Sequence, residues 1–175
     1  MNTERSDKKI AELKAQGPQY LRRLITHTQH FEATPEVVFP LLCPTTEFDW
    51  MDGWDCEMIY SKSLIQEYNA VFKTDYFIPG EVWVVSQFEP NRSIEFVRIS
   101  ETLSIKVDAR ILDNLDGTCT GNWIVNITAL TEQGNAALRS LNPEDEPIGI
   151  LIDALAHYIR NDTIKPLPDG IFNKK

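Results

Sequence analysis

The fold is decided by residues 103–129, which have the sequence LSIKVDARILDNLDGTCTGNWIVNITA. Apolar and polar residues alternate from Leu103 to Asp113 and again from Cys119 to Ala129, and turn residues lie between the two runs. Side chains alternate between the two faces of a β-strand, so this pattern places the apolar residues on one face. The stretch therefore predicts two antiparallel strands of a sheet that is buried on one side only.

Similar runs continue toward the N-terminus. Turn residues separate them at fairly regular intervals, which is typical of an antiparallel meander. We expect these strands at residues 54–61, 67–74, 81–89 and 93–99. Residues 24–32 are rich in β-branched and aromatic side chains and predict one more strand at the start of the domain. The sequence thus predicts about seven antiparallel strands.

The segments before the meander predict short helices. Residues 3–16 have weak helical periodicity, which Gly17 ends. Thr34 is suited to cap a short helix, because Pro35 follows it in the first turn, where a missing N–H costs nothing. Residues 45–52 predict a second short helix or a structured loop.

The main helix is expected near the C-terminus. Residues 131–141 begin a helical pattern that residues 142–145 interrupt. Apolar residues then recur at spacings of three and four, at Ile148, Leu151, Ile152, Leu155, Ala156 and Ile159. A one-sided sheet needs a cover, and this is the only apolar helix face long enough to provide it.

Length and charge narrow the classes of partner. The chain has 175 residues, the size of one domain, a formal net charge of -9 and a sequence pI of about 4.8. This acidic balance repels phosphate backbones, so we expect no nucleic-acid partner. The sequence has no run of about 20 apolar residues, so we expect no membrane insertion. We expect a monomer or a homodimer in the cytoplasm.

The cysteines and the ends of the chain lead to further expectations. Cys43, Cys56 and Cys119 form no CxxC pair, so we expect reduced thiols, no metal site and no cofactor. We divide the chain into an N-terminal arm at residues 1–23, one domain at residues 24–165 and a C-terminal tail at residues 166–175.

Three segments carry a resemblance to a known superfamily, and it extends over roughly residues 25–160. The segments are ATPEVVFPLLCPTTEFDWMDGW from Ala33, FEPNRSIEF from Phe88 and DGTCTGNWIVNITALTEQG from Asp116. On these segments the chain resembles the START/Bet v-like superfamily, also called SRPBCC, and its polyketide cyclase/dehydrase-like branch. The resemblance implies an α+β helix-grip fold, in which a curved sheet holds the C-terminal helix around an apolar cavity.

Large apolar side chains are candidates to line the implied cavity and to bind a ligand there. The alternative is that they fill the core, because aromatic residues bury well without any ligand. The Trp50–Trp54 segment has its own turn residues, and we expect it to border one end of the cavity and to gate it. The candidates are Trp50, Trp54, Phe72, Trp83, Phe96, Trp123 and Leu155.

Arg98 is the charged candidate. It follows Phe96 at the spacing of two, so both side chains lie on one face of their strand. A buried guanidinium needs an anionic partner, which could be Glu67, Glu81 or a ligand carboxylate. The alternative is a salt bridge at the rim.

Acidic residues cluster next to two of the tryptophans. A carboxyl held against apolar aromatics has a raised pKa and could act as a general acid or base. The alternative is that these residues are solvated caps and turns. The cluster comprises Glu47, Asp49, Asp52, Asp55 and Glu57.

No hydrolase, metalloprotease, nucleotide-binding or dinucleotide-binding motif occurs in the sequence. The leading hypothesis is therefore a protein that binds a small hydrophobic molecule, either lipid-like or aromatic and polyketide-like. One alternative is a polyketide cyclase or aromatase that uses an acid or base in the pocket. Another is a protein-interaction domain similar to the co-chaperone relatives, which would need an exposed apolar patch.

Overall fold

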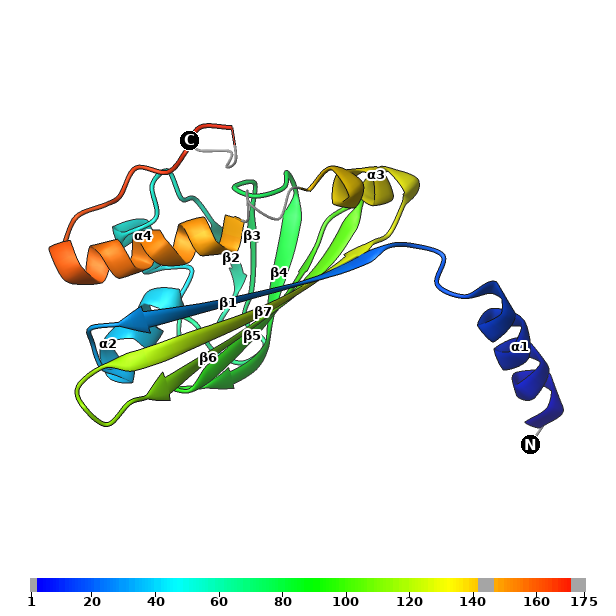
Figure 1. The fold of residues 1–175 in the computed structure, drawn as a ribbon, viewed down its shortest axis with the longest axis horizontal. Coiled ribbons are helices and arrows are strands. Elements are labelled where there is room, and N and C mark those ends of the chain that lie inside the picture. The colour runs from blue at the N-terminus through cyan, green and yellow to red at the C-terminus, as the bar shows by residue number, and fades with distance from the viewer. Residues whose placement is uncertain (1–2, 142–146, 171–175) are drawn as a thin grey trace.

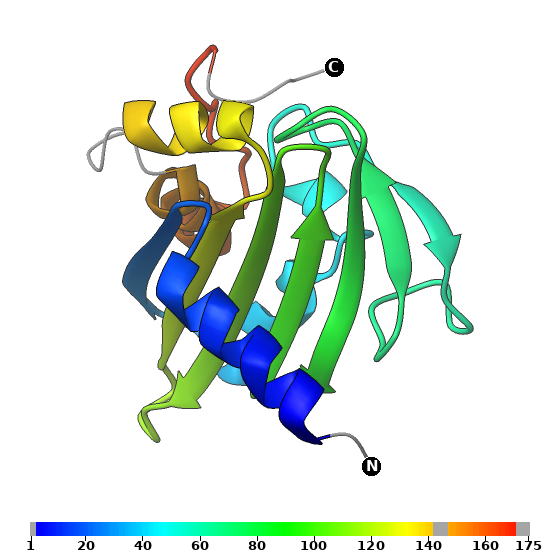
Figure 2. The same ribbon diagram turned by 90° about the vertical axis from the view of Figure 1, so that its right-hand side faces the viewer.

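The structure, a computed structural model, describes residues 3–141 and 147–170 (Figure 1). Seven strands form one antiparallel sheet in the order β1-β7-β6-β5-β4-β3-β2. Figure 2 shows how strongly this sheet curves. The strands are β1 (Arg22–Phe31), β2 (Glu57–Tyr60), β3 (Val71–Thr74), β4 (Glu81–Glu89), β5 (Ser93–Ile99), β6 (Leu103–Asp113) and β7 (Cys119–Ala129).

The helices confirm the predicted helix-grip architecture. Two short helical turns follow β1, a third precedes β2, and the long C-terminal helix lies across the inner face of the sheet (Figure 1). They are α1 (Thr3–Gln16), α2 (Pro35–Val38), the 3-10 helices η1 (Phe39–Leu42) and η2 (Glu47–Asp49), α3 (Glu132–Ser140) and α4 (Pro147–Asn161). Thr34 occupies the cap position of α2, although its side chain makes no capping hydrogen bond. The predicted interruption at residues 142–145 lies outside the described residues.

Strands β4 to β7 have the predicted bounds. Strands β2 and β3, at one edge of the sheet, are shorter than predicted. β2 and β3 were predicted at residues 54–61 and 67–74. The loop between them is organised by Glu67, whose carboxylate accepts hydrogen bonds from the Ser63 hydroxyl at 3.0 Å and from the Lys62 amide. Asn69, which lies within the predicted strand 67–74, has a φ of 64°. This left-handed conformation cannot continue a strand, so β3 begins only at Val71.

The core lies between the sheet and α4. The apolar stripe of α4 is buried as predicted, and Leu155 has no exposed surface. Gly149 of α4 faces β1, where a Cβ would lie in ordinary van der Waals contact with the His27 ring, at 3.4 Å. After α4, residues 165–167 continue along the domain, with Leu167 buried and its amide donating to Asp52 at 3.1 Å.

The N-terminal helix α1 projects away from the sheet (Figure 1). Its residues from Arg5 onward are all exposed, including Ile10 and Leu13. None of the described helices combines the length and the apolar composition that a membrane crossing requires.

The first prediction concerns the cover that α4 provides. Leu155→Ala should lower the free energy of unfolding by about 2–5 kcal/mol, because a fully buried leucine leaves a cavity when it is truncated. Urea denaturation monitored by circular dichroism measures this change. The matched control is Leu24→Ala on the outer face of β1, where the leucine is 63% exposed and the loss should stay below about 0.5 kcal/mol. Equal losses in the two variants would contradict the proposed role of α4.

Candidate functional site

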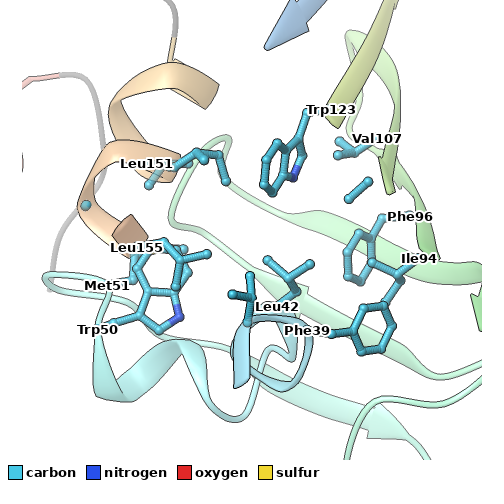
Figure 3. Close-up of a cluster of buried hydrophobic side chains, with 14 of the residues drawn as sticks. Phe39, Leu42, Trp50, Met51, Ile94, Phe96, Val107, Trp123, Leu151 and Leu155 are labelled. Atoms are coloured by element: carbon cyan, nitrogen blue, oxygen red, sulfur yellow. The ribbon is translucent and has the colours of Figure 1, made fainter. Parts of the chain in front are cut away.

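A cavity of about 270 Å³ lies between the inner face of the sheet and the helices α3 and α4. Its walls are mostly aliphatic and aromatic side chains from β5, β6, β7 and α4. Figure 3 shows Trp123 of β7 and Leu151 of α4 pointing toward each other across the interior, with Phe96 and Leu42 nearby. Ala137 of α3 both lines the cavity and is exposed, so the cavity reaches the surface beside α3.

Strand alternation builds the sheet wall of this cavity. Ile105, Val107 and Ala109 of β6 point inward, as the sequence pattern predicted, and all three line the cavity. On β7, Gly121 makes room for the neighbouring inward side chain: a Cβ there would lie 2.4 Å from the Trp123 ring. Any other residue at position 121 would therefore displace the indole from its place in the wall.

Five of the eight candidate ligand-binding residues line the cavity, and they come from four different elements. They are Trp50, which follows η2, Trp83 of β4, Phe96 and Arg98 of β5, and Trp123 of β7. The Trp50–Trp54 segment, which we expected to gate the cavity, is closed to the outside, with Trp50 1% and Trp54 6% exposed.

The other three candidates are buried outside the cavity wall. Trp54 donates its indole N–H to the Pro44 carbonyl at 2.8 Å. Phe72 stacks on Trp83 at a centroid distance of 5.2 Å, on the side of Trp83 toward the edge of the sheet. Leu155 lies about one helical turn beyond Leu151 and packs in the core. Trp54, Phe72 and Leu155 therefore fill the core, which was the alternative to a place in the cavity wall.

Arg98 forms a buried ion pair with Glu81, one of the three partners considered. Its Nη2 donates to both carboxylate oxygens, at 2.7 and 2.6 Å, and Nε donates to one of them at 3.2 Å. The side chains are 10% and 1% exposed, so the pair is not a rim salt bridge. The guanidinium lies 4.4 Å from the ring centroids of both Phe77 and Trp83. Burial lowers the pKa of Arg98 and raises that of Glu81, and each partner's charge opposes the shift.

Glu47 is the acidic residue that faces the cavity. It lies in η2, and it and Arg98 are the ionisable residues of the cavity wall within the described part of the chain. Burial raises the pKa of the Glu47 carboxyl from its ordinary 4.5 to about 8, although the Arg98 charge acts in the opposite direction. The side chain keeps some accessible surface, which we attribute to the cavity because the carboxyl is strongly desolvated.

The other four members of the acidic cluster have structural or solvated positions. Asp52 accepts from the Leu167 amide, and Glu57 forms an exposed ion pair with Lys73 at 2.9 Å. Asp49 is exposed, and Asp55 is half-buried, with its carbonyl accepting a hydrogen bond from Thr74 at 2.6 Å. The sequence identified the cluster but could not single out Glu47, because a 3-10 turn has no long periodicity that would reveal which side chain points inward.

The sequence analysis did not include several wall residues among the candidates. Met51, Phe77 and Ile78 lie in irregular segments, which carry no periodic signal. The aliphatic residues of β6 and α4 were recognised as a buried face, but alternation does not distinguish a packed side chain from one that borders a hollow.

The sequence matches no protein-family model and no curated protein. Comparison with solved structures finds norcoclaurine synthase from Thalictrum flavum in complex with dopamine and hydroxybenzaldehyde, at 10% identity and a TM-score of 0.59, over 83% of this chain and 91% of that one. CalU16 from Micromonospora echinospora has 13% identity and a TM-score of 0.55, over 83% and 87%. A START superfamily protein from Mycobacterium smegmatis has 10% identity and a TM-score of 0.61, over 80% and 99%.

The chain has the START/Bet v 1-like helix-grip fold. At these identities the likeness concerns the fold, so the chemistry of this helix-grip cavity has to be argued from its own residues.

The raised pKa of Glu47 predicts a pH dependence of stability. The folded protein keeps this proton up to about pH 8, whereas an unfolded chain loses it near 4.5, so the unfolded state binds fewer protons between these values. The contribution of Glu47 is fully present below about pH 4.5 and is lost as the pH rises to about 8, by at most about 1.4 kcal/mol per pH unit. Glu47→Gln should not show this loss. Urea melts across this range measure the difference.

Glu57→Gln is the matched control, because Glu57 is exposed at an edge strand. Its pH profile should follow that of the unaltered protein. Parallel profiles for the unaltered protein and Glu47→Gln would show that the Glu47 carboxyl is not desolvated.

Proposed function

We propose that this protein binds a small, largely apolar molecule, lipid-like or aromatic, in the cavity between the sheet and α4. The observation that carries the proposal is the apolar hollow itself. Its volume of about 270 Å³ compares with roughly 10–15 Å³ needed to hold one water molecule, and its walls offer water few polar partners. A concave apolar pocket with a few convergent polar groups is the usual form of a small-molecule site.

The shape of the wall favours a ligand with a flat or branched apolar body. Trp50, Trp83, Phe96 and Trp123 present aromatic rings to the interior. Such rings gain dispersion and edge contacts with other rings, in addition to the area that they bury. The complex of norcoclaurine synthase with dopamine and hydroxybenzaldehyde is consistent with aromatic occupants of a similar fold, although at 10% identity it concerns that protein.

Filling the cavity should abolish binding. Ala109 is 2% exposed and lines the wall, so Ala109→Phe would occupy the space that a ligand needs. We expect a panel of fatty acids and naphthalene derivatives to raise the melting temperature of the unaltered protein and to have no effect on this variant. Ile99→Phe on the exposed outer face of the sheet is the control and should behave like the unaltered protein.

Tryptophan fluorescence locates the ligand independently. Trp123→Phe should reduce the ligand-induced change, because Trp123 lines the wall, and Trp54→Phe should leave it intact. If no member of the panel changes either melting temperature or fluorescence, the proposal is rejected.

A second candidate function is an enzyme in which Glu47 transfers a proton, as a polyketide cyclase or aromatase would require. The favouring observation is a titratable carboxyl in the cavity wall with a pKa of about 8, close to the range in which acid–base catalysis at neutral pH is effective. Such a group is protonated at neutral pH, so it could act as a general acid that donates its proton to a substrate carbonyl oxygen during ring closure.

The test of catalysis is turnover of a diketone that can cyclise. Glu47→Gln should abolish turnover while preserving ligand-induced stabilisation, whereas Glu57→Gln should change neither. Turnover that survives Glu47→Gln, or a failure of the unaltered protein to accelerate cyclisation, would reject the catalytic candidate and leave the binding proposal standing.

A further inference from the structure

The cavity has one polar corner, made by Glu47 from η2 and Arg98 from β5. Within residues 3–141 and 147–170, the Glu47 carboxyl forms no hydrogen bond and no ion pair. Arg98 uses Nε and Nη2 to bind Glu81, and its Nη1 makes no hydrogen bond within the same residues. Glu47 and Arg98 border the cavity, so a ligand that displaces water from this corner has to supply the partners that the described residues do not.

The charges of this corner already cancel. The Arg98 cation is balanced by the Glu81 anion, with two carboxylate oxygens on one guanidinium. The Arg98 charge favours the Glu47 anion, but desolvation of the carboxyl outweighs it, so Glu47 is held as a neutral acid. Glu47 therefore presents a carboxylic O–H donor to the cavity, and the Arg98 cation lies in the same corner. The net charge of Glu47, Arg98 and Glu81 together is zero.

This arrangement discriminates between ligand head groups. A ligand carboxylate would bring an uncompensated negative charge into an apolar cavity that already holds the Glu81 anion. An alkylammonium would place a second positive charge next to Arg98. An uncharged carbonyl oxygen loses only its own hydration, which the Glu47 hydrogen bond replaces.

On the basis of the proposed function, we propose that the cavity selects uncharged ligands with an acceptor oxygen, such as an aryl or alkyl ketone or aldehyde. The oxygen accepts a hydrogen bond from the neutral Glu47 carboxyl in the field of the Arg98 guanidinium. Glu47 is thus the specificity-determining residue of the site, and the aromatic wall supplies the apolar contact.

Binding of such a ligand depends on pH through Glu47. Besides Arg98, the titratable groups whose charge interacts with Glu47 and whose pKa is shifted by it are Tyr76 and Cys56, in neighbouring loops. Burial raises the pKa of Tyr76, and it raises the pKa of the Cys56 thiol to about 12, so both stay neutral near pH 8. Glu47 is therefore the group in this corner that changes charge as the pH rises through about 8. Above that value the donor is lost, and affinity for a ketone falls toward that of the hydrocarbon, by about the tenfold that one hydrogen bond contributes.

The test uses four probes with the same naphthalene body: 2-acetonaphthone, 2-ethylnaphthalene, 2-naphthoate and 2-naphthylmethylammonium. Isothermal titration calorimetry near pH 6.5 should show the ketone binding at least about tenfold more tightly than each of the others, on the order of one good hydrogen bond. Its affinity should decline above about pH 8, whereas the hydrocarbon's affinity should not change.

Three variants assign the effect to Glu47. Glu47→Gln retains an N–H donor, so it should keep the preference for the ketone and lose the pH dependence. Glu47→Leu should bind the ketone and the hydrocarbon equally. Glu57→Gln should match the unaltered protein in both respects. The pH series on the unaltered protein decides the question if a Glu47 variant fails to fold.

Several outcomes would overturn the inference while the proposed function stands. These are equal affinity for ketone and hydrocarbon, a ketone affinity that does not change with pH, or tighter binding of the naphthoate. If all four probes fail to bind, the proposed function for aromatic ligands and this inference are both rejected.

Discussion

The structure depends on the need to cover one apolar face of a wide sheet with a single helix. Seven strands about 4.8 Å apart span on the order of 30 Å, whereas a helix with its side chains is about 10–12 Å wide. Helix α4 lies against the β1 side of the sheet, so the inner faces of β4 to β6 extend beyond its reach. The sheet curves toward the helix, and η1, η2 and α3 close the remaining sides. A hollow is the consequence of this geometry, and its walls are apolar because they belong to the face that must be buried.

The curvature has identifiable local causes. The register of the β4–β5 pair shifts between Val85 and Gln87, and bulges of this kind bend a strand and increase its twist. On β7, Gly121 leaves the space into which the Trp123 ring folds. The bend brings the sheet around α4, and the glycine keeps a large aromatic flat against the wall. The bulge thus shapes the sheet, and the glycine shapes the cavity wall.

Much of the fold was predictable from the sequence, because alternation survives wherever one face is buried and the other is wet. The bounds of β4 to β7 follow from that pattern, and the stripe of α4 follows from the spacing of its apolar residues. The candidate site was less predictable. Phe72 and Trp83 are paired across two neighbouring strands, yet only Trp83 borders the cavity. Trp83 lies on the strand farther from the edge of the sheet, and the alternation of apolar and polar residues does not reveal how far a strand lies from that edge. Glu47 and Asp49 are two residues apart in an irregular turn, and the tertiary fold alone makes one of them buried.

The polar corner is difficult to explain by stability. Replacing a buried ion pair with apolar residues of similar volume is often neutral or stabilising, so the Arg98–Glu81 pair is weak evidence for a role in stability. Glu47 has even less structural reason to face inward, because its carboxyl is desolvated and forms no hydrogen bond within the described residues. An apolar side chain at position 47 would remove that cost and add contact with the aromatic wall. Since the fold gains nothing from this carboxyl, its position is better explained by the molecule that enters the cavity than by the protein that surrounds it.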